Sequence, residues 1–294
     1  MKKKFIAITF LLLITFGMIG CGKNQVLKKE NVNETNQEQA TENKETTEEQ
    51  KENTNNNTEE QSQSQIDYIN IAPEEVKIPI LMYHSISDED PSNNLLVPPA
   101  MFEEQMAWLE ANNFTAMNMD EALEAMRTGK VPKRPVVITF DDGYANNYTS
   151  AFPSLKNHKL KATFFVITDG VDNGYYMSSD NLKEMQDAGM SIENHTANHL
   201  ELNNLSKTDA YESIKRAQDY LRNVIGSDGN YLCYPVGKYN DETIQIEEEL
   251  GIKAAVTTQG GFASINDGLH TLKRVRISPM SIEGFASIFS EYIN

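Results

Sequence analysis

Cysteine is scarce in this chain: Cys21 and Cys233 are the only two among 294 residues. If Cys21 is modified, no internal disulfide can form, and the folded part must be stabilised by an ordinary hydrophobic core. Positive charge is scarce as well, with 26 Lys and Arg against 43 Asp and Glu and a net charge of -17. This balance argues against a nucleic-acid partner, because a phosphate backbone requires a basic surface. A neutral or partly cationic glycan is easier to accommodate than an acidic polymer.

Long hydrophobic runs are missing except at the start, where three lysines at 2–4 precede an apolar run at 5–16. A basic start and a short apolar run are typical of an export signal, and the run is short for a membrane span. Met18-Ile19-Gly20-Cys21 resembles the lipobox of bacterial lipoproteins, although Leu is more usual at the first position. We therefore expect 1–21 to be a lipoprotein signal peptide with lipid attached at Cys21. The protein would be exported and lipid-anchored to the cell membrane, facing the cell wall; an uncleaved anchor is the alternative.

Apolar residues are almost absent from 22–75, which consists mainly of Asn, Gln, Glu, Thr, Lys and Ser. Such a composition cannot offset the entropy lost when a chain becomes ordered. We expect 22–75 to be a disordered polar linker. The remaining 76–294 has a length that suits one domain with a sizeable core.

From Val76 onward, short apolar runs alternate with amphipathic stretches, the pattern of strands and helices around a mainly parallel sheet. Expected strands are 78–83, 135–140, 162–167, 190–192, 231–234 and 254–257. Expected helices are 102–109, 122–126, one ending near 155, 181–188, 209–224 and 243–250. The number of alternating elements predicts an α/β fold that closes into a barrel or distorted barrel.

Reactive groups in such folds lie beyond the carboxyl ends of the strands. Asp141 and Asp142 follow one expected strand, His195 and His199 follow another, and His84 follows the first, so all five would share one rim. Asp-Asp-Gly alone is also an ordinary turn, and most histidine pairs four residues apart are merely exposed. Together, one carboxylate and two imidazoles complete a three-ligand site for a divalent metal, with an open position for water. The second carboxylate, Asp141, could act as the base that such water needs.

Two segments resemble known motifs: Thr139-Phe140-Asp141-Asp142-Gly143 and His195-Thr196-Ala197-Asn198-His199. They are similar to the first two motifs of the polysaccharide deacetylases, the NodB-homology or carbohydrate esterase 4 family, and the resemblance covers nearly all of 76–294. It implies a distorted (β/α) barrel, with Asp141 as base and with Asp142, His195 and His199 as metal ligands. Zinc is the expected ion, with cobalt or nickel as alternatives.

The third family motif, Arg-x-Pro-Tyr, is altered: Cys233 stands at the Arg position and Val236 at the Tyr position. The resemblance implies that the backbone N–H of Val236 still helps to hold the oxyanion, because a backbone group survives a side-chain change. The Arg that orients the base is missing. Arg274 or Arg276 would be its substitute.

The family's late Leu-x-His motif, which supplies the general acid, is absent. Met82-Tyr83-His84-Ser85 resembles the N-terminal motif of the branch that deacetylates poly-N-acetylglucosamine, which implies His84 as the acid. His270 is the alternative, as is a hydrogen-bonded structural His84. Four tyrosines near these loops could stack on sugar rings, although packing explains each equally well: Tyr144, Tyr175, Tyr176 and Tyr239.

The resemblance predicts metal-dependent N-deacetylation of an N-acetylglucosamine-containing cell-surface polysaccharide, either poly-N-acetylglucosamine or peptidoglycan, with release of acetate. The altered motifs leave a non-catalytic glycan-binding lipoprotein of the same fold as an alternative. A glycosidase that uses Asp141 and Asp142 as its acid pair is a second alternative. Adjacent carboxylates beside two histidines fit a metal better than they fit the separations that glycosidases need.

Overall fold

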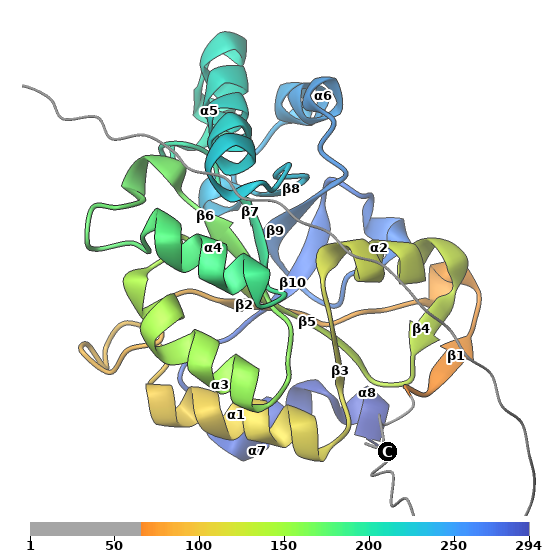
Figure 1. Cartoon of the computed structure of the whole chain (residues 1–294). Coiled ribbons are helices and arrows are strands. Elements are labelled where there is room, and N and C mark those ends of the chain that lie inside the picture. The colour runs from red at the N-terminus through yellow and green to blue at the C-terminus, as the bar shows by residue number, and fades with distance from the viewer. Residues whose placement is uncertain (1–65, 294) are drawn as a thin grey trace, which may run out of the picture. The chain divides into compact units, whose positions relative to one another are not determined.

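The computed structural model describes residues 66–293 (Figure 1). The expected signal peptide, Cys21 and the linker up to residue 65 lie outside the described residues. The end of the expected linker is folded, because β1 (Tyr68–Asn70) pairs with β4 (Lys130–Pro132) and a 3-10 helix, η1 (Pro73–Glu75), follows it. These residues before Val76 are therefore connected to the barrel domain through β4.

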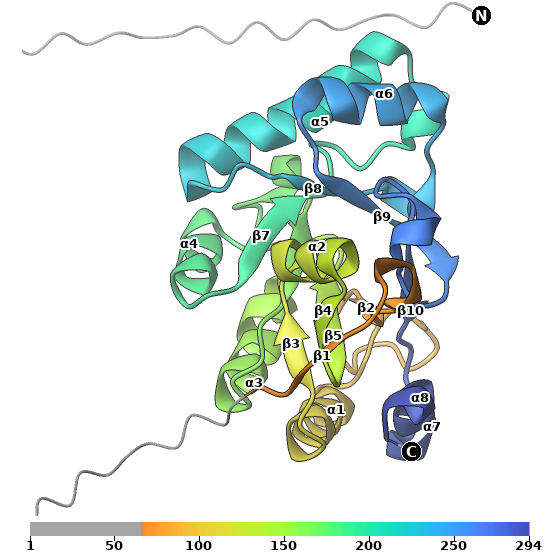
Figure 2. The same cartoon turned by 90° about the vertical axis from the view of Figure 1, so that its right-hand side faces the viewer.

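The centre of the domain is a closed ring of seven parallel strands (Figures 1 and 2). In ring order they are β2 (Ile80–Tyr83), β10 (Leu272–Arg276), β9 (Ala254–Gly260), β8 (Tyr231–Cys233), β7 (Ser191–Asn194), β6 (Thr163–Val166) and β5 (Pro135–Phe140). The ring closes because β5 pairs with β2 as well as with β6. A further strand, β3 (Thr115–Met117), pairs with the first half of β5 on the side where β6 pairs with the second half. The expected distorted (β/α) barrel is confirmed.

Helices form the outer layer. They are α1 (Pro99–Ala111), α2 (Met119–Thr128), α3 (Phe152–Asn157), α4 (Ser179–Asp187), α5 (Lys207–Tyr220), α6 (Asp241–Leu250), α7 (Ile282–Ile288) and α8 (Ser290–Ile293). Single 3-10 turns are η3 (Thr168–Gly170), η4 (Leu202–Asn204), η6 (Pro235–Gly237) and η7 (Ile265–Asp267), and π-helical turns are η2 (Asn147–Ala151) and η5 (Leu221–Ile225). Helices α5 and α6 lie together at the top of Figure 1, and α1 and α7 at its bottom, with the strands between them.

Local signals explain where these helices begin and end. Asn118 Oδ1 accepts a hydrogen bond from the N–H of Glu121, the Glu121 carboxylate accepts one from the N–H of Asn118, and this reciprocal cap starts α2. Gly129 ends the same helix in a left-handed conformation, with φ of 75°. Ser178 caps α4 in the same reciprocal way. The sequence therefore places these helices locally, and packing against the barrel decides how they are arranged.

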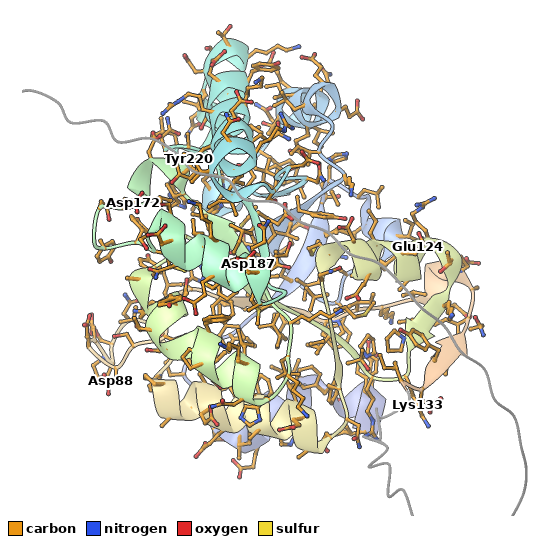
Figure 3. The ribbon with its side chains drawn as sticks, viewed as in Figure 1. Asp88, Glu124, Lys133, Asp172, Asp187 and Tyr220 are labelled. Atoms are coloured by element: carbon orange, nitrogen blue, oxygen red, sulfur yellow. The ribbon has the colours of Figure 1, made fainter. Side chains whose placement is uncertain are left out.

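Side chains alternate along the strands between the barrel interior and the helical layer. Phe140 faces the helices, where its ring stacks on Phe164 at 4.6 Å and on Tyr83 at 5.4 Å between centroids. Val137 points the other way, into the interior cluster that contains Phe165. Ionisable side chains such as Asp88, Lys133 and Asp187 lie on the outside (Figure 3). Within residues 66–293, no helix has the length and apolar character needed to cross a membrane.

Candidate active site

Five polar side chains meet at the carboxyl ends of the strands, as the sequence predicts. Asp141 and Asp142 directly follow β5, His195 directly follows β7, and His84 directly follows β2. His199 lies further along the loop that begins at His195. Because β5 pairs with β2 and with β6, and β6 pairs with β7, parallel strands deliver all five groups to one rim.

Asp142, His195 and His199 form a compact set of three donor atoms. Asp142 Oδ1 lies 3.2 Å from His195 Nε2 and 3.4 Å from His199 Nε2. Zinc binds nitrogen and oxygen at about 2.1 Å, so two ligands of a tetrahedral ion lie about 3.4 Å apart. The set therefore fits a divalent ion, with a side open for water or substrate.

The hydrogen bonding of His195 also supports a metal site. Its Nδ1 donates to the backbone carbonyl of Cys233 at 2.7 Å, so Nε2 is the atom that faces Asp142. A neutral ring would then present a lone pair to a carboxylate oxygen, which is unfavourable unless a cation lies between them. Burial lowers the pKa of His195, but Cys233 and Asp142 outweigh it and raise the pKa well above its usual value. The site favours positive charge at the place where a metal would bind.

Backbone strain concentrates at this rim. Asp142, Thr196, His199 and Val236 all have positive φ, between 55° and 73°. Thr196 and Val236 are β-branched, and such residues rarely adopt this conformation. Strained backbone persists where surrounding contacts force it, which is common at functional sites. Here the four residues lie in the loops after β5, β7 and β8.

Asp141 faces a different partner from Asp142. Both of its oxygens accept hydrogen bonds from Arg274, Nη1 to Oδ1 and Nη2 to Oδ2, each at 2.7 Å. Burial would raise the pKa of the Asp141 carboxyl, but the charge and hydrogen bonds of Arg274 hold it well below the usual range. Asp141 is therefore an oriented carboxylate beside the metal-ligand set.

Arg274 is fully buried and has its remaining donors satisfied. Its Nε donates to the carbonyl of Thr257 at 2.9 Å, and its guanidinium also contacts Thr139 Oγ1 at 3.1 Å and Cys233 Sγ at 3.3 Å. Cys233 stands where the Arg of the third motif is expected, so a guanidinium from β10 lies against the side chain that replaced it. Of the two expected substitutes, Arg274 holds Asp141, and Arg276 is exposed.

Comparison with known proteins gives this arrangement a family. Residues 128–255 match the family model described as polysaccharide deacetylase. The YxkH protein of Bacillus subtilis (strain 168), which carries the family name polysaccharide deacetylase, is 40% identical over 218 residues, covering 74% of this chain and 76% of its own. The chain belongs to the polysaccharide deacetylase family. The resemblance seen in its first two motifs is confirmed.

Two further relatives support membership of the polysaccharide deacetylase family. The deacetylase PplD of Streptococcus pyogenes, solved in complex with acetate, is 36% identical with a TM-score of 0.70, covering 72% of this chain and 97% of its own. The poly-beta-1,6-N-acetyl-D-glucosamine N-deacetylase of Staphylococcus epidermidis is 27% identical over 69% of this chain and 80% of its own. The residues that match the family model include Asp141, Asp142, His195 and His199.

The two histidines considered for the family's general acid lie in different places. His84 Nε2 is 3.8 Å from Asp141 Oδ2, and its buried Nδ1 has no hydrogen-bond partner. Burial lowers the pKa of His84, although Asp141 and Asp142 act against the shift. His270 instead precedes β10, and its Nδ1 is 2.6 Å from Glu247 on α6. The structure brings His84, and not His270, to the rim.

Val236, expected to offer the family's oxyanion donor, lies in η6 directly after β8. Its side chain is 55% exposed, and its backbone is left-handed with φ of 56°. The next residue must be glycine, because a Cβ at Gly237 would lie 2.2 Å from Thr258 Oγ1. A close approach between η6 and β9 thus holds this strained turn at the rim.

Proposed function

We propose that this protein is a metal-dependent hydrolase that removes acetyl groups from N-acetylglucosamine units of a cell-surface polysaccharide. The observation that supports it best is the juxtaposition of two differently held carboxylates: Asp142 facing two histidines, and Asp141 clamped by Arg274. Amide hydrolysis needs a bound, activated water and an oriented base beside it. This pair of environments meets both needs.

Asp142, His195 and His199 would hold the ion, and zinc suits their nitrogen and oxygen donors, with cobalt or nickel as alternatives. A divalent ion at that place supplies Lewis acidity, which lowers the pKa of water and polarises a carbonyl. Cys233 contributes through its backbone, because its carbonyl fixes which nitrogen of His195 points inward.

The chain's own groups supply the proton transfers in this proposal. Asp141 takes a proton from water while Arg274 keeps the carboxylate aimed, so little reorganisation is needed during the reaction. The backbone N–H of Val236 donates to the oxygen that becomes negative. His84 Nε2, 3.8 Å from Asp141 Oδ2, receives from Asp141 the proton that came from water and delivers it to the departing amine.

Both alternatives from the sequence are less compatible with this geometry. A glycosidase acid must be protonated, whereas Arg274 keeps Asp141 ionised by binding both of its oxygens. A purely binding protein has no need for a buried Arg that orients a carboxylate beside a metal-ligand set. Arg274, which comes from a different strand, replaces the Arg missing from the third motif. That missing Arg was the reason to consider loss of activity.

Poly-N-acetylglucosamine is the first substrate to test, because a relative covered over 80% of its length carries the name poly-beta-1,6-N-acetyl-D-glucosamine N-deacetylase. Peptidoglycan is the second, since it presents the same N-acetylated sugar. The net charge of -17 is compatible with a neutral chain that becomes cationic as acetyl groups are removed.

The deciding experiment measures acetate released from poly-N-acetylglucosamine and from peptidoglycan by the full chain, before and after chelation and after zinc or cobalt is restored. Acetate release that disappears with chelation and returns with metal supports the proposal. Asp141→Asn is the matched variant: it should keep the metal but lose roughly 10²-fold or more in kcat. Full activity in Asp141→Asn, or activity that survives complete metal removal, would sink the assignment.

Anchoring to the membrane through Cys21 is a separate proposal, supported by the signal-like sequence of 1–21. Lipid attachment requires the thiol of Cys21, so Cys21→Ser should move the protein from the membrane fraction to the medium or to an unprocessed precursor. Labelling with a radioactive fatty acid provides the readout. Equal labelling of wild type and Cys21→Ser would contradict lipidation at this residue.

A further inference from the structure

Large exposed apolar side chains gather around the metal-ligand set. In the described part of the chain, Tyr175 is 65% exposed, Val236 55% and Leu200 49%. These three residues lie on consecutive loops, after β6, β8 and β7 respectively. The remaining exposed ones belong to 66–69 or to Ile293 near the end of the chain. Exposed apolar groups that cluster beside a site indicate a surface that contacts a ligand or a partner molecule.

Tyr175 is part of an aromatic cluster that two loops build together. Its ring lies edge-on to Tyr144 at 5.5 Å and to Tyr176 at 5.1 Å, and Tyr144 and Tyr176 stack on each other at 5.6 Å. The backbone joins the same two loops, because Ala145 N–H donates to the carbonyl of Tyr175 at 3.1 Å. The geometry of this cluster is specified by contacts at both the side chains and the main chain.

Further contacts hold the loop that carries Tyr175. The Asn173 carboxamide accepts hydrogen bonds from the N–H groups of Tyr175 and Tyr176. Asp172, labelled in Figure 3, accepts a bond from the N–H of Ser179 at 2.9 Å and so ties the loop to α4. Gly170 is required beneath it, since a Cβ there would lie 2.5 Å from the ring of Tyr176. The ring of Tyr175 is thus exposed to solvent, while hydrogen bonds and packing hold the loop that carries it.

The cluster adjoins the catalytic groups. Tyr144 follows Asp142 by two residues, and the carbonyl of Gly143 between them accepts a hydrogen bond from the N–H of Met177 at 2.9 Å. On the other side of the histidine ligands, Val236 continues the apolar surface, and beyond it Tyr239 stacks on Tyr234 at 4.5 Å. Apolar and aromatic groups therefore flank the metal-ligand set on two sides.

The chemistry of this surface suits an uncharged sugar chain. A pyranose ring has a face of C–H groups that packs on an aromatic ring, while its hydroxyls bond to polar groups around it, and tyrosine offers both kinds of contact. The apolar groups are single side chains separated by the polar metal ligands, in contrast with the continuous apolar core of a typical protein interface. A sugar chain, in which apolar ring faces and polar hydroxyls repeat, matches this alternation of apolar and polar groups on the protein.

We propose that Tyr175, supported by Tyr144 and Tyr176, is a stacking subsite for the sugar unit next to the one that loses its acetyl group. Leu200 and Val236 continue the contact across the metal-ligand set, so the protein acts on a chain of several uncharged pyranose units and poorly on short fragments. This inference rests on the proposed function and deepens it, because it names the residues that select for chain length.

The test compares wild type with Tyr175→Ala and Tyr175→Phe on linear N-acetylglucosamine oligomers of two, four and six units, with acetate release as the readout. Loss of one stacked ring corresponds to roughly a tenfold change in affinity. We expect Tyr175→Ala to raise KM for the tetramer and hexamer roughly tenfold, with a smaller change for the dimer and in kcat. Tyr175→Phe keeps the ring and should stay within about twofold of wild type.

Tyr68→Ala is the matched control, because Tyr68 is also an exposed tyrosine, at 46%, but lies on β1. It should leave KM unchanged at every chain length. A KM in Tyr175→Ala that equals that of wild type for all oligomers would overturn the subsite, as would a rise in KM that appears in Tyr68→Ala instead. Calorimetric binding of the tetramer to Asp141→Asn, with and without Tyr175→Ala, separates the two proposals. If wild type releases no acetate, the function fails, but ring-dependent binding still supports the subsite, and ring-independent binding contradicts it.

Discussion

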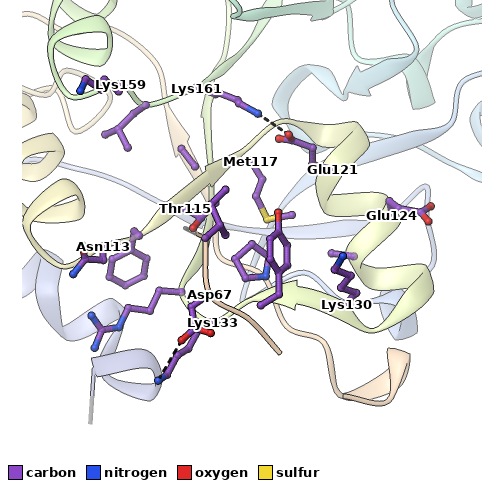
Figure 4. Close-up of a pocket in the computed structure, with 18 of the residues that line it drawn as sticks. Asp67, Asn113, Thr115, Met117, Glu121, Glu124, Lys130, Lys133, Lys159 and Lys161 are labelled. Carbon is purple, nitrogen blue, oxygen red and sulfur yellow. Dashed lines mark hydrogen bonds and ion pairs between the residues drawn. The ribbon is translucent and has the colours of Figure 1, made fainter. Parts of the chain in front are cut away.

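The two ends of the barrel differ in a way that shows what makes a functional site. A cavity of about 1340 Å³ lies at the amino ends of β5 and β6, lined by β1, β3, α2 and the segment before β6 (Figure 4). Two pairs of its charged groups lie close together: Lys161 Nζ lies 2.6 Å from Glu121, and Lys133 Nζ lies 3.8 Å from Asp67. Lys130 lies over the ring of Tyr68 at 5.0 Å.

The carboxyl end is richer in convergent chemistry. Among the described residues, both groups of side chains that could hold a metal lie there: Asp142 with His195 and His199, and Asp141 with His195 and Cys233. Convergence of donors, strained backbone and a buried oriented carboxylate are the features on which the proposed site rests, and the volume of the amino-end cavity is not one of them. The predictions below test this contrast between the two ends.

Replacing a histidine at each end should give the largest difference. In the proposed mechanism His195→Ala removes a metal ligand, so bound metal should be lost and acetate release should fall roughly 10³-fold. His158→Ala is the matched control, because His158 lines the amino-end cavity and pairs with Glu103 and Glu110 on the outer surface. Metal content and acetate release are the measurements. Metal and activity retained in His195→Ala, or lost in His158→Ala, would reverse the assignment of the two ends.

Arg274→Leu should lower both activity and stability. With the orienting partner gone, Asp141 can turn away, and a small misplacement of a catalytic group costs roughly 10²-fold in rate. The buried carboxylate is also left unpaired, which costs about 3–5 kcal/mol of unfolding free energy. Urea unfolding and kcat are the measurements, with Arg276→Leu on the same strand as the exposed control.

The double variant Asp141→Asn with Arg274→Leu removes the unpaired charge, so it should recover part of the stability that Arg274→Leu loses, without recovering activity. A single variant Arg274→Leu with the kcat and stability of wild type would mean that the buried pair orients nothing.

Glu193→Gln tests the barrel interior between the two ends. Burial raises the pKa of Glu193 to about 7, although Ser191 and the N–H of Tyr231 donate to it. A folded-state pKa above the unfolded value of 4.5 means that the folded protein binds more protons between these limits, so stability falls as pH rises from about 4.5 to about 7. The loss reaches about 3 kcal/mol. Glu193→Gln should be more stable than wild type at pH 8 and nearly equal at pH 5.

Urea unfolding at both pH values measures this difference. Glu124→Gln, an exposed carboxylate at the amino-end cavity, controls for the loss of one negative charge. An equal gap between Glu193→Gln and wild type at pH 5 and at pH 8 would show that Glu193 titrates normally.

Lys161→Ala should have the smallest effect. Its ammonium pairs with Glu121, but both side chains are nearly half exposed, and such pairs contribute under about 1 kcal/mol. Lys161 is the better partner to remove, because Glu121 also caps α2. Activity should be unchanged. A several-fold rise in KM for a long oligomer would show that the amino-end cavity contacts substrate.

Much of the barrel follows from local sequence signals. The strand 135–140 and the helix ended by Gly129 appear where apolar patterning and capping residues predict them. β10 escaped prediction because Leu-Lys-Arg-Val-Arg alternates charged and apolar residues, as an exposed strand would. In the barrel its Arg274 points inward, where Asp141 compensates the charge. β1 escaped because it is short, and its pairing with the distant β4 leaves no local pattern.

By itself, the sequence determined the family, the barrel and the positions of Asp141, Asp142, His195, His199 and His84, because each follows a strand whose apolar pattern is local. The tertiary structure alone decided that Arg274 and not Arg276 holds Asp141, that His270 contacts Glu247 on α6 and does not lie at the rim, and that three tyrosines form one cluster. These facts depend on ring closure and on strand register, which bring together residues far apart in the chain. No local pattern encodes such contacts, since their energies arise only when the barrel is complete.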